Sequence, residues 1–198
     1  MTVKILLVLL AGIGSGIFLL EPEFMAKTDI LLDIGLCLLL FFVGIDIGNN
    51  KKAFTHLKKI GFKLLLIPIS AAMGSILGGM IVSVFIGMNI FEGGAVGAGF
   101  GWYSLSAILI APYSSELSTI AFLTNVFREI LAVIFIPITA KYIGYFETIA
   151  LGGATAMDTT LPIITRNTNS ETAVVSFVSG LLMSIFVPIL VPLFIALI

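Results

Sequence analysis

Long apolar stretches alternate with short polar joints along the chain, and their lengths indicate the fold class. One membrane crossing needs about 20 apolar residues. On that measure the sequence divides into seven membrane-deep segments, at about residues 3–20, 29–48, 62–87, 94–112, 117–142, 148–164 and 172–198. The first three are long enough to cross as ordinary helices. The fourth and sixth are interrupted by glycine and proline, which favours unwound or re-entrant backbone. We therefore expect an all-α integral membrane protein.

Composition supports this fold class and removes other classes. Hydrophobic residues make up 59% of the 198 residues, and charged residues only 11%. A soluble domain carries roughly 25% charged residues, so a soluble fold is excluded. A nucleic-acid-binding protein is excluded too, because phosphate contacts need many lysines and arginines. Cys37 is the only cysteine, which rules out an intrachain disulfide and a cysteine metal cluster. We expect contact with the lipid bilayer, no metal and no cofactor.

Basic residues in the joints predict the orientation, because cytoplasmic loops carry the excess of lysine and arginine. One joint, between the second and third segments, holds five lysines: Lys51, Lys52, Lys58, Lys59 and Lys63. We interpret this cluster as a cytoplasmic topology signal. If every segment crosses, Lys4 and Arg166 share its side, and Lys27 and Lys141 lie outside. The N-terminus is then inside and the C-terminus outside.

An internal repeat emerges when the chain is aligned with itself at one fixed offset. The offset that places Gly97 on Gly152 also pairs Glu116 with Glu171, Phe122 with Phe177, Thr124 with Ser179, Ile130 with Ile185, and Pro137 with Pro192. Residues 1–93 would then hold three ordinary spans, and residues 94–198 two units of a broken segment plus a long helix. Paired broken segments are typical of the midplane site of a transporter. We expect residues 1–198 to form one transmembrane transporter domain.

Five charged residues lie inside the predicted segments: Asp33, Asp46, Arg128, Glu129 and Asp158. A charge in the membrane costs on the order of 3 kcal/mol, so each should pair, line a water-filled cavity or change protonation. Asp46 is close to Lys51 and Lys52 and fits an interfacial ion pair. Asp33 is close enough to a segment end to reach headgroup water. These two are weaker candidates than the other three.

Glu129 and Asp158 are the leading candidates for a transport site. Glu129 lies about 12 residues, or roughly 18 Å, into its predicted helix and so near mid-membrane. Asp158 follows a Gly-Gly break beside Thr155 and Thr159, whose hydroxyls can contact an ion or ligand. The alternatives are structural: Glu129 pairing with an arginine, and Asp158 capping the break through backbone N–H groups.

Further polar and aromatic candidates accompany these acids. Asn125, Arg128 and Glu129 share one broad helix face, since they are three and four residues apart; Arg128 would orient Glu129 or repel cations. The glycine-rich fourth segment adds the candidates Trp102, Tyr103, Ser104 and Ser106. Aromatic rings attract ammonium groups, which favours a place in the cavity. The alternative for the two aromatic residues is an interfacial belt.

Two long motifs and one short one resemble those of a known family. They are residues 99–106 (GFGWYSLS), residues 153–162 (GATAMDTTLP), and Phe42-Val43-Gly44-Ile45, together with Arg128, Glu129 and Pro137. The chain resembles the LysO family of bacterial lysine exporters over essentially its whole length. The resemblance implies export of L-lysine and its analogues across the bacterial cytoplasmic (inner) membrane. It also implies that acids matching Asp158 and Glu129 are needed for transport.

The chain departs from the family pattern in two ways. Single-chain members have roughly three further spans ahead of the matched region, and members can carry Asp where Asn125 stands here. Because Met1-Thr2-Val3-Lys4 is typical of a natural start, we expect a split transporter. Its partner would be a small membrane subunit equivalent to the missing N-terminal third. The alternative is a truncated chain.

A transport mechanism follows from the charge of lysine as substrate. Lysine is a monocation, and an inside-negative potential opposes its exit by about 2.3 kcal/mol per 100 mV. Exchange with a proton at Asp158 first and Glu129 second would cancel this cost, with Ser104, Ser106 and Thr155 as polar lining. We do not expect an enzyme, because an intramembrane aspartyl protease needs a second aspartate motif. The alternatives are a sodium-coupled organic-anion carrier and a non-transporting subunit of a larger complex.

Overall fold

The computed structural model describes residues 65–198 continuously, together with residues 11, 12, 14–16, 34, 38, 41 and 45. The chain divides into two compact units, residues 1–46 and 47–198, and the fold described below is that of the second. Asp33, Asp46 and the lysine cluster lie outside the described residues. So do most of the predicted segments at 3–20 and 29–48.

Three long helices form the frame of the second unit: α4 (Leu66–Ile86), α7 (Ser115–Tyr142) and α10 (Ser170–Ile195). Each is long and apolar enough to cross a membrane. The side chains of Ser114 and Asn169 accept hydrogen bonds from Leu117 and Thr172 N–H, and so cap the first turns of α7 and α10. Between residues 65 and 198 all elements are helical. The prediction of an all-α membrane protein is confirmed in this respect, while the count of seven segments stays a prediction.

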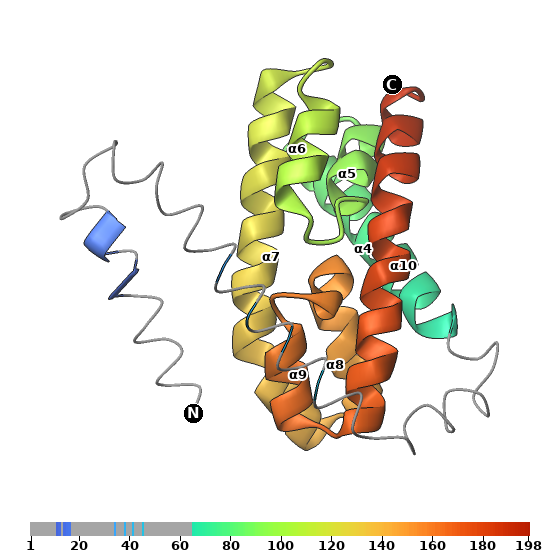
Figure 1. Cartoon of the computed structure of the whole chain (residues 1–198). Helices are drawn as coiled ribbons and strands as arrows, with labels where there is room; N and C mark the ends of the chain where they lie inside the picture. The colour runs from blue at the N-terminus through green and yellow to red at the C-terminus, as the bar shows by residue number, and fades with distance from the viewer. Residues whose placement is uncertain are drawn as a thin grey trace. The chain divides into compact units, whose positions relative to one another are not determined.

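The first glycine-rich segment folds as a helical hairpin. It consists of α5 (Ile90–Gly97) and α6 (Tyr103–Ile110), each eight residues or about 12 Å long. Neither arm can cross a hydrocarbon core of about 30 Å. The Tyr113 hydroxyl donates to Glu92 Oε1 at 3.2 Å and ties the end of the second arm to the start of the first. The hairpin therefore opens at one end of the bundle (Figure 1).

The second broken segment forms a similar hairpin at the other end. Its elements are α8 (Tyr145–Gly152), the 3₁₀ turn η2 (Gly153–Met157) and α9 (Leu161–Asn167). The Thr155 hydroxyl donates to Gly152 O at 2.8 Å and lies 3.2 Å from the Thr160 hydroxyl, which closes the turn between the arms. In Figure 1, α8 and α9 occupy the lower half of the bundle, below α5 and α6.

The tips of the two hairpins meet between α7 and α10. Ala154 N–H donates to Phe100 O at 2.9 Å, so irregular backbone from one tip bonds irregular backbone from the other. Gly153 has φ +64°, and a Cβ there would collide with Phe100 O, so this contact requires glycine. Non-helical backbone is tolerated at membrane depth where protein buries it. The glycine interruptions thus place two half-length hairpins tip to tip.

Each hairpin has its own apolar core. The first core lies around α5, α6 and the upper part of α10, and includes Val96, Phe100, Ile110, Met183 and Val187. The second lies around α8, α9 and the lower part of α7, and includes Ile136, Ile149, Ile164, Ala156 and Val175. The tips therefore meet where one core gives way to the other.

Two chain units of similar plan result from this arrangement. The bounds of α8 follow those of α5 by the same offset that separates Ser115 from Ser170, the first residues of α7 and α10. In Figure 1 the first unit (residues 90–142) enters its hairpin from the top and the second (residues 145–195) from the bottom. The two units thus run in opposite directions.

The hairpins change the expected side of one basic residue. Counting each broken segment as a crossing placed Lys141 and Arg166 on opposite sides. The second hairpin turns back on itself, so α8 starts and α9 finishes at the same end. The last turn of α7 holds Lys141 and the last turn of α9 holds Arg166, and both turns lie at the bottom of Figure 1. The expectation that Lys141 and Arg166 lie on opposite sides was wrong for this reason.

Candidate functional site

Two acids far apart in the sequence meet where the hairpin tips join. Glu129 lies in the middle of α7, and Asp158 follows η2 at the break of the second hairpin. Thr159 stands between them: its backbone N–H and its hydroxyl both donate to Asp158 Oδ1, and its side chain interacts with the Glu129 carboxylate. Tyr103, at the start of α6, lies within electrostatic range of both acids. We name these four residues the carboxylate cluster.

The carboxylate cluster is set up to hold a cation or a proton. Both acids are partly buried. In the stretch from residue 65 to 198, no lysine or arginine pairs with either of them. Two neighbouring carboxylates repel one another, and burial penalises their charged forms. A bound proton or an ammonium group relieves both costs. Over the described residues no group of three or more His, Cys, Asp or Glu is placed to hold a metal ion.

Asn125 lies one turn before Glu129 on α7 and braces the first hairpin. Its Oδ1 accepts the Gly101 N–H at 2.7 Å, and its Nδ2 donates to Ala121 O at 2.9 Å. The side chain is 2% exposed. A Cβ at Gly99 would press on the Asn125 amide, so the glycine makes room for it. This buried amide fixes the tip of the hairpin from which Tyr103 starts.

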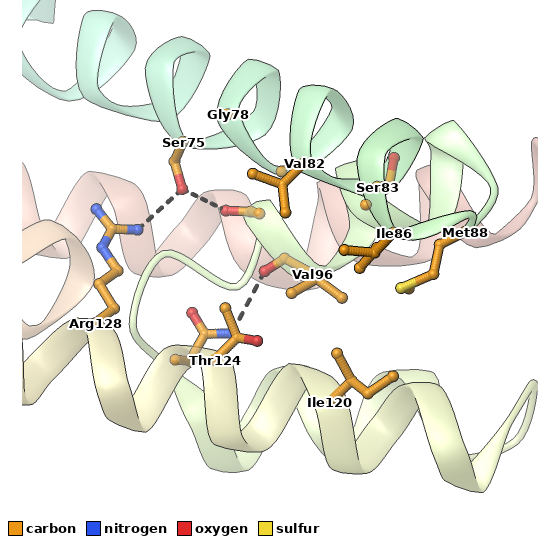
Figure 2. Close-up of a pocket in the computed structure, with 14 residues that line it drawn as sticks. Ser75, Gly78, Val82, Ser83, Ile86, Met88, Val96, Ile120, Thr124 and Arg128 are labelled. Carbon is orange, nitrogen blue, oxygen red and sulfur yellow. Dashed lines mark hydrogen bonds between the residues drawn. The ribbon is translucent and has the colours of Figure 1, made fainter.

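Arg128 points away from Glu129. Its Nη1 donates to Ser75 Oγ at 3.0 Å and its Nη2 to Ala150 O at 3.3 Å, which ties α7 to α4 and α8. Adjacent residues on a helix do not face each other. Figure 2 shows the guanidinium at one end of a cavity between α4, α5 and α7, reaching toward Ser75. Among the described residues, the hydrogen-bond partners of the Arg128 guanidinium therefore lie on α4 and α8.

The remaining candidates fall inside the hairpins or on their surface. The Thr155 and Ser106 side chains are buried and bond their own hairpins, Thr155 to Gly152 O and Ser106 to Tyr103 O. Tyr103 packs edge-on against Phe122, with ring centroids 5.5 Å apart. Trp102 and Ser104 are exposed on the surface of the bundle formed by residues 65–198. The structure thus brings Tyr103 and Thr159 to the acids.

One residue of the site escaped sequence reasoning. Ser75 lies in a predicted apolar span with no unusual spacing, and its hydroxyl both donates to Gly97 O at 2.7 Å and accepts from Arg128. A signal was present in the small residues around it, Gly74, Gly78 and Gly79. Such residues mark helix faces where another backbone approaches closely.

Comparison with known proteins identifies the family. The profile described as "Lysine exporter LysO" matches residues 6–195. The chain belongs to the LysO family. An Escherichia coli (strain K12) protein named "Lysine exporter LysO" is 32% identical over 185 residues, which is 92% of this chain. A Haemophilus influenzae protein named "Putative lysine exporter" is 35% identical over 160 residues, which is 79% of this chain and 80% of the relative.

The LysO relatives differ from this chain in length. The matched region covers 60% of the Escherichia coli protein. No solved structure matches this LysO family member. Both relatives are named as transporters rather than enzymes, in keeping with a cluster of acids at a helix break.

Proposed function

We propose that this LysO family member exports L-lysine and its analogues across the bacterial cytoplasmic membrane in exchange for protons. The observation that carries the proposal is the carboxylate cluster, where Glu129 and Asp158 meet at the tips of two half-length hairpins with Thr159 between them. The names of the two relatives support lysine as the substrate.

Competition for one site couples the two movements. The lysine ammonium group and the proton both neutralise the carboxylate cluster, so binding of one favours release of the other. Moving lysine outward against the membrane potential costs about 2.3 kcal/mol per 100 mV, and a proton moving inward returns the same amount. The pH gradient is then the net drive. Asp158 takes the first role because it lies at the break in the helical backbone, and Glu129 the second.

The helix ends around the midplane suit a zwitterionic substrate. The arms α5 and α8 end at Gly97 and Gly152, and their carboxyl ends attract cations; α6 and α9 begin there, and their amino ends attract anions. We propose that residues 90–142 and 145–195 are inverted-topology repeats, as in other secondary transporters. Rocking of one unit against the other would open the site to each side in turn.

The distribution of basic residues orients the protein in this proposal. Lys141 and Arg166 share one end of the helical bundle formed by residues 65–198, and α4 starts toward that end, shortly after the lysine cluster in sequence. By the positive-inside rule this end is cytoplasmic, which places the C-terminus outside. A small membrane subunit supplies the equivalent of the relatives' additional length, and its copurification from native membranes tests that part.

Transport by purified protein in liposomes tests the function. The liposomes are loaded with lysine, and the outside is made acidic. We expect Asp158→Asn to lower lysine efflux by more than about tenfold and Glu129→Gln to lower it by a similar factor, because neutral side chains no longer exchange a proton for a cation. The matched control is Glu116→Gln, which makes the same chemical change in the first turn of α7.

The efflux measurements distinguish the proposed proton exchange from its alternatives. Efflux that persists in Asp158→Asn at the rate of Glu116→Gln contradicts the assignment, provided that both variants melt at the wild-type temperature. Efflux that needs sodium instead of a pH gradient replaces the proton by Na⁺ at Asp158 and Thr159. Absence of flux by the wild type, restored on adding a copurified subunit, assigns transport to the assembly.

A further inference from the structure

The carboxylate cluster leaves one charged group in the middle of α7 unused. Arg128 is midway along the 28 residues of α7, and so deep in the membrane. Its guanidinium donates to a hydroxyl and a carbonyl, both neutral. Over residues 65–198 no carboxylate pairs with it. A guanidinium has five N–H donors, and the two bonds leave several of them available for an anion.

A cavity of about 240 Å³ opens beside this guanidinium. The cavity lies between α4, α5 and α7, and Figure 2 shows Val82, Ile86, Met88 and Ile120 along its length. The Arg128 end also has Ser75, while Ser83 lies among the apolar residues at the other end. Pockets for drug-sized ligands measure roughly 300–1,000 Å³, so this smaller cavity suits a smaller molecule. It presents a cation and donors at one end and apolar walls elsewhere.

Arg128 also borders hollows on its other side. One of 590 Å³ runs along α7 past Leu131 and Phe135 to Leu151, and one of 460 Å³ lies between Ser70 of α4 and Leu151. The guanidinium therefore stands between space directed toward the top of α4 and space directed toward the bottom of α7.

We propose that Arg128 binds the α-carboxylate of the transported amino acid. The proposal rests on the proposed function and deepens it, since it assigns the second pole of the substrate. Guanidinium binds carboxylate through two parallel hydrogen bonds, which fix orientation as well as supply energy. Ser75 holds the guanidinium in place at 3.0 Å. A desolvated arginine left without an anion is costly, so a substrate lacking the carboxylate is rejected.

Arg128 and Glu129 are neighbours on α7, so in this proposal they bind the two oppositely charged groups of one substrate molecule. Their Cα atoms are about 3.8 Å apart, yet their side chains serve different faces of α7. A lysine molecule carries an anion and a cation separated by a long flexible stem. In this proposal Arg128, whose guanidinium lies next to Gly153, binds the carboxylate, and the carboxylate cluster binds the ammonium group. Substrates are thereby selected as amino acids and not as simple diamines.

Binding of lysine and of lysinamide, whose carboxylate is replaced by a neutral amide, tests the proposal. Trp102, the only tryptophan, stands next to Tyr103 at the hairpin tip and reports binding by its fluorescence in the full chain. We expect the wild type to prefer lysine by at least about tenfold. Arg128→Gln should weaken lysine by about 30-fold or more and lysinamide by less than about threefold.

Two further variants keep the test decisive. Arg128→Lys retains the charge without the fork and should restore part of the preference. Lys141→Gln removes a cation from the end of the same helix and should leave both affinities unchanged. If Arg128→Gln fails to fold, the Arg128→Lys comparison of the two ligands carries the test.

Two results would overturn the proposal while the proposed function stands. They are equal binding of lysine and lysinamide by the wild type, and equal weakening of both by Arg128→Gln. By contrast, a wild type that neither binds nor exports lysine would refute the proposed function itself.

Discussion

The two hairpin-and-helix units of this LysO family member share a backbone plan. They differ in how the long helix of each unit contacts its hairpin. In the first unit, glycine stands on the hairpin at Gly99 and a large amide on the long helix at Asn125. In the second, at the equivalent positions of the repeat, the hairpin carries Ala154 and the helix carries Gly180. A Cβ on Gly180 would collide with the backbone of Met157 and Ala154. One contact is thus hydrogen-bonded and the other close-packed.

The same comparison separates chemistry from architecture. Glu129 of the first long helix corresponds to Ser184 of the second, and Asp158 of the second break corresponds to Tyr103 of the first. The acids therefore come one from each unit, from non-equivalent places. Because the tips meet, both still reach the same cluster. Pairing of the units creates the site, and neither unit holds it alone.

The close-packed contact should be the more fragile of the two. Gly180→Ala places a methyl group against fixed backbone, and we expect a loss of about 3 kcal/mol in unfolding free energy. Thermal unfolding followed by Trp102 fluorescence measures it. Gly74→Ala in α4, where no described atom lies within 4 Å, is the control and should change little. Equal melting temperatures for the two variants would contradict the close-packed interpretation.

The hydrogen-bonded contact should respond less strongly. Asn125→Ala leaves the Gly101 N–H without its acceptor, and a buried unsatisfied donor costs about 1–3 kcal/mol. Lysine efflux should also fall, because without this bond the hairpin tip at Gly101 can shift, and Tyr103 of the carboxylate cluster follows it in the chain. Asn125→Asp keeps an acceptor oxygen and should retain more stability than Asn125→Ala. Identical melting curves for these two variants would show that the Gly101 bond contributes nothing.

The smallest effect is expected where the second unit lacks the acid. The Ser184 hydroxyl donates to Gly180 O at 2.9 Å within its own helix and lies 3.6 Å from the Met157 sulfur of η2. Ser184→Ala should change stability by about 0.5 kcal/mol or less, since such a bond to the preceding turn adds little, and lysine efflux should stay at the wild-type rate. An efflux defect as large as that of Glu129→Gln would mean that the two units contribute equally to transport.

From the sequence, the candidates that could be singled out were residues whose type is costly in lipid. Glu129 and Asp158 stood out because carboxylates are rare at membrane depth, and the hairpin breaks stood out because glycine and proline interrupt long apolar helices. Spacing along a helix did not give the direction in which each side chain points. Arg128 shares a broad face with Glu129 by spacing, but its side chain reaches α4 and α8. Thr155, expected as lining, closes the turn of its own hairpin.

The sequence by itself determined that the protein suits a lipid environment and that its segments are helical. Both follow from the scarcity of charge and from the lengths of the apolar runs. The offset of the internal repeat was also visible there, and it matches the bounds of α5 and α8. Only the tertiary structure decided that the broken segments turn back, that Lys141 joins Arg166 at one end, and that Asp158 meets Glu129. Those outcomes depend on contacts between residues distant in the chain, such as the bond from Ala154 N–H to Phe100 O, which no local pattern encodes.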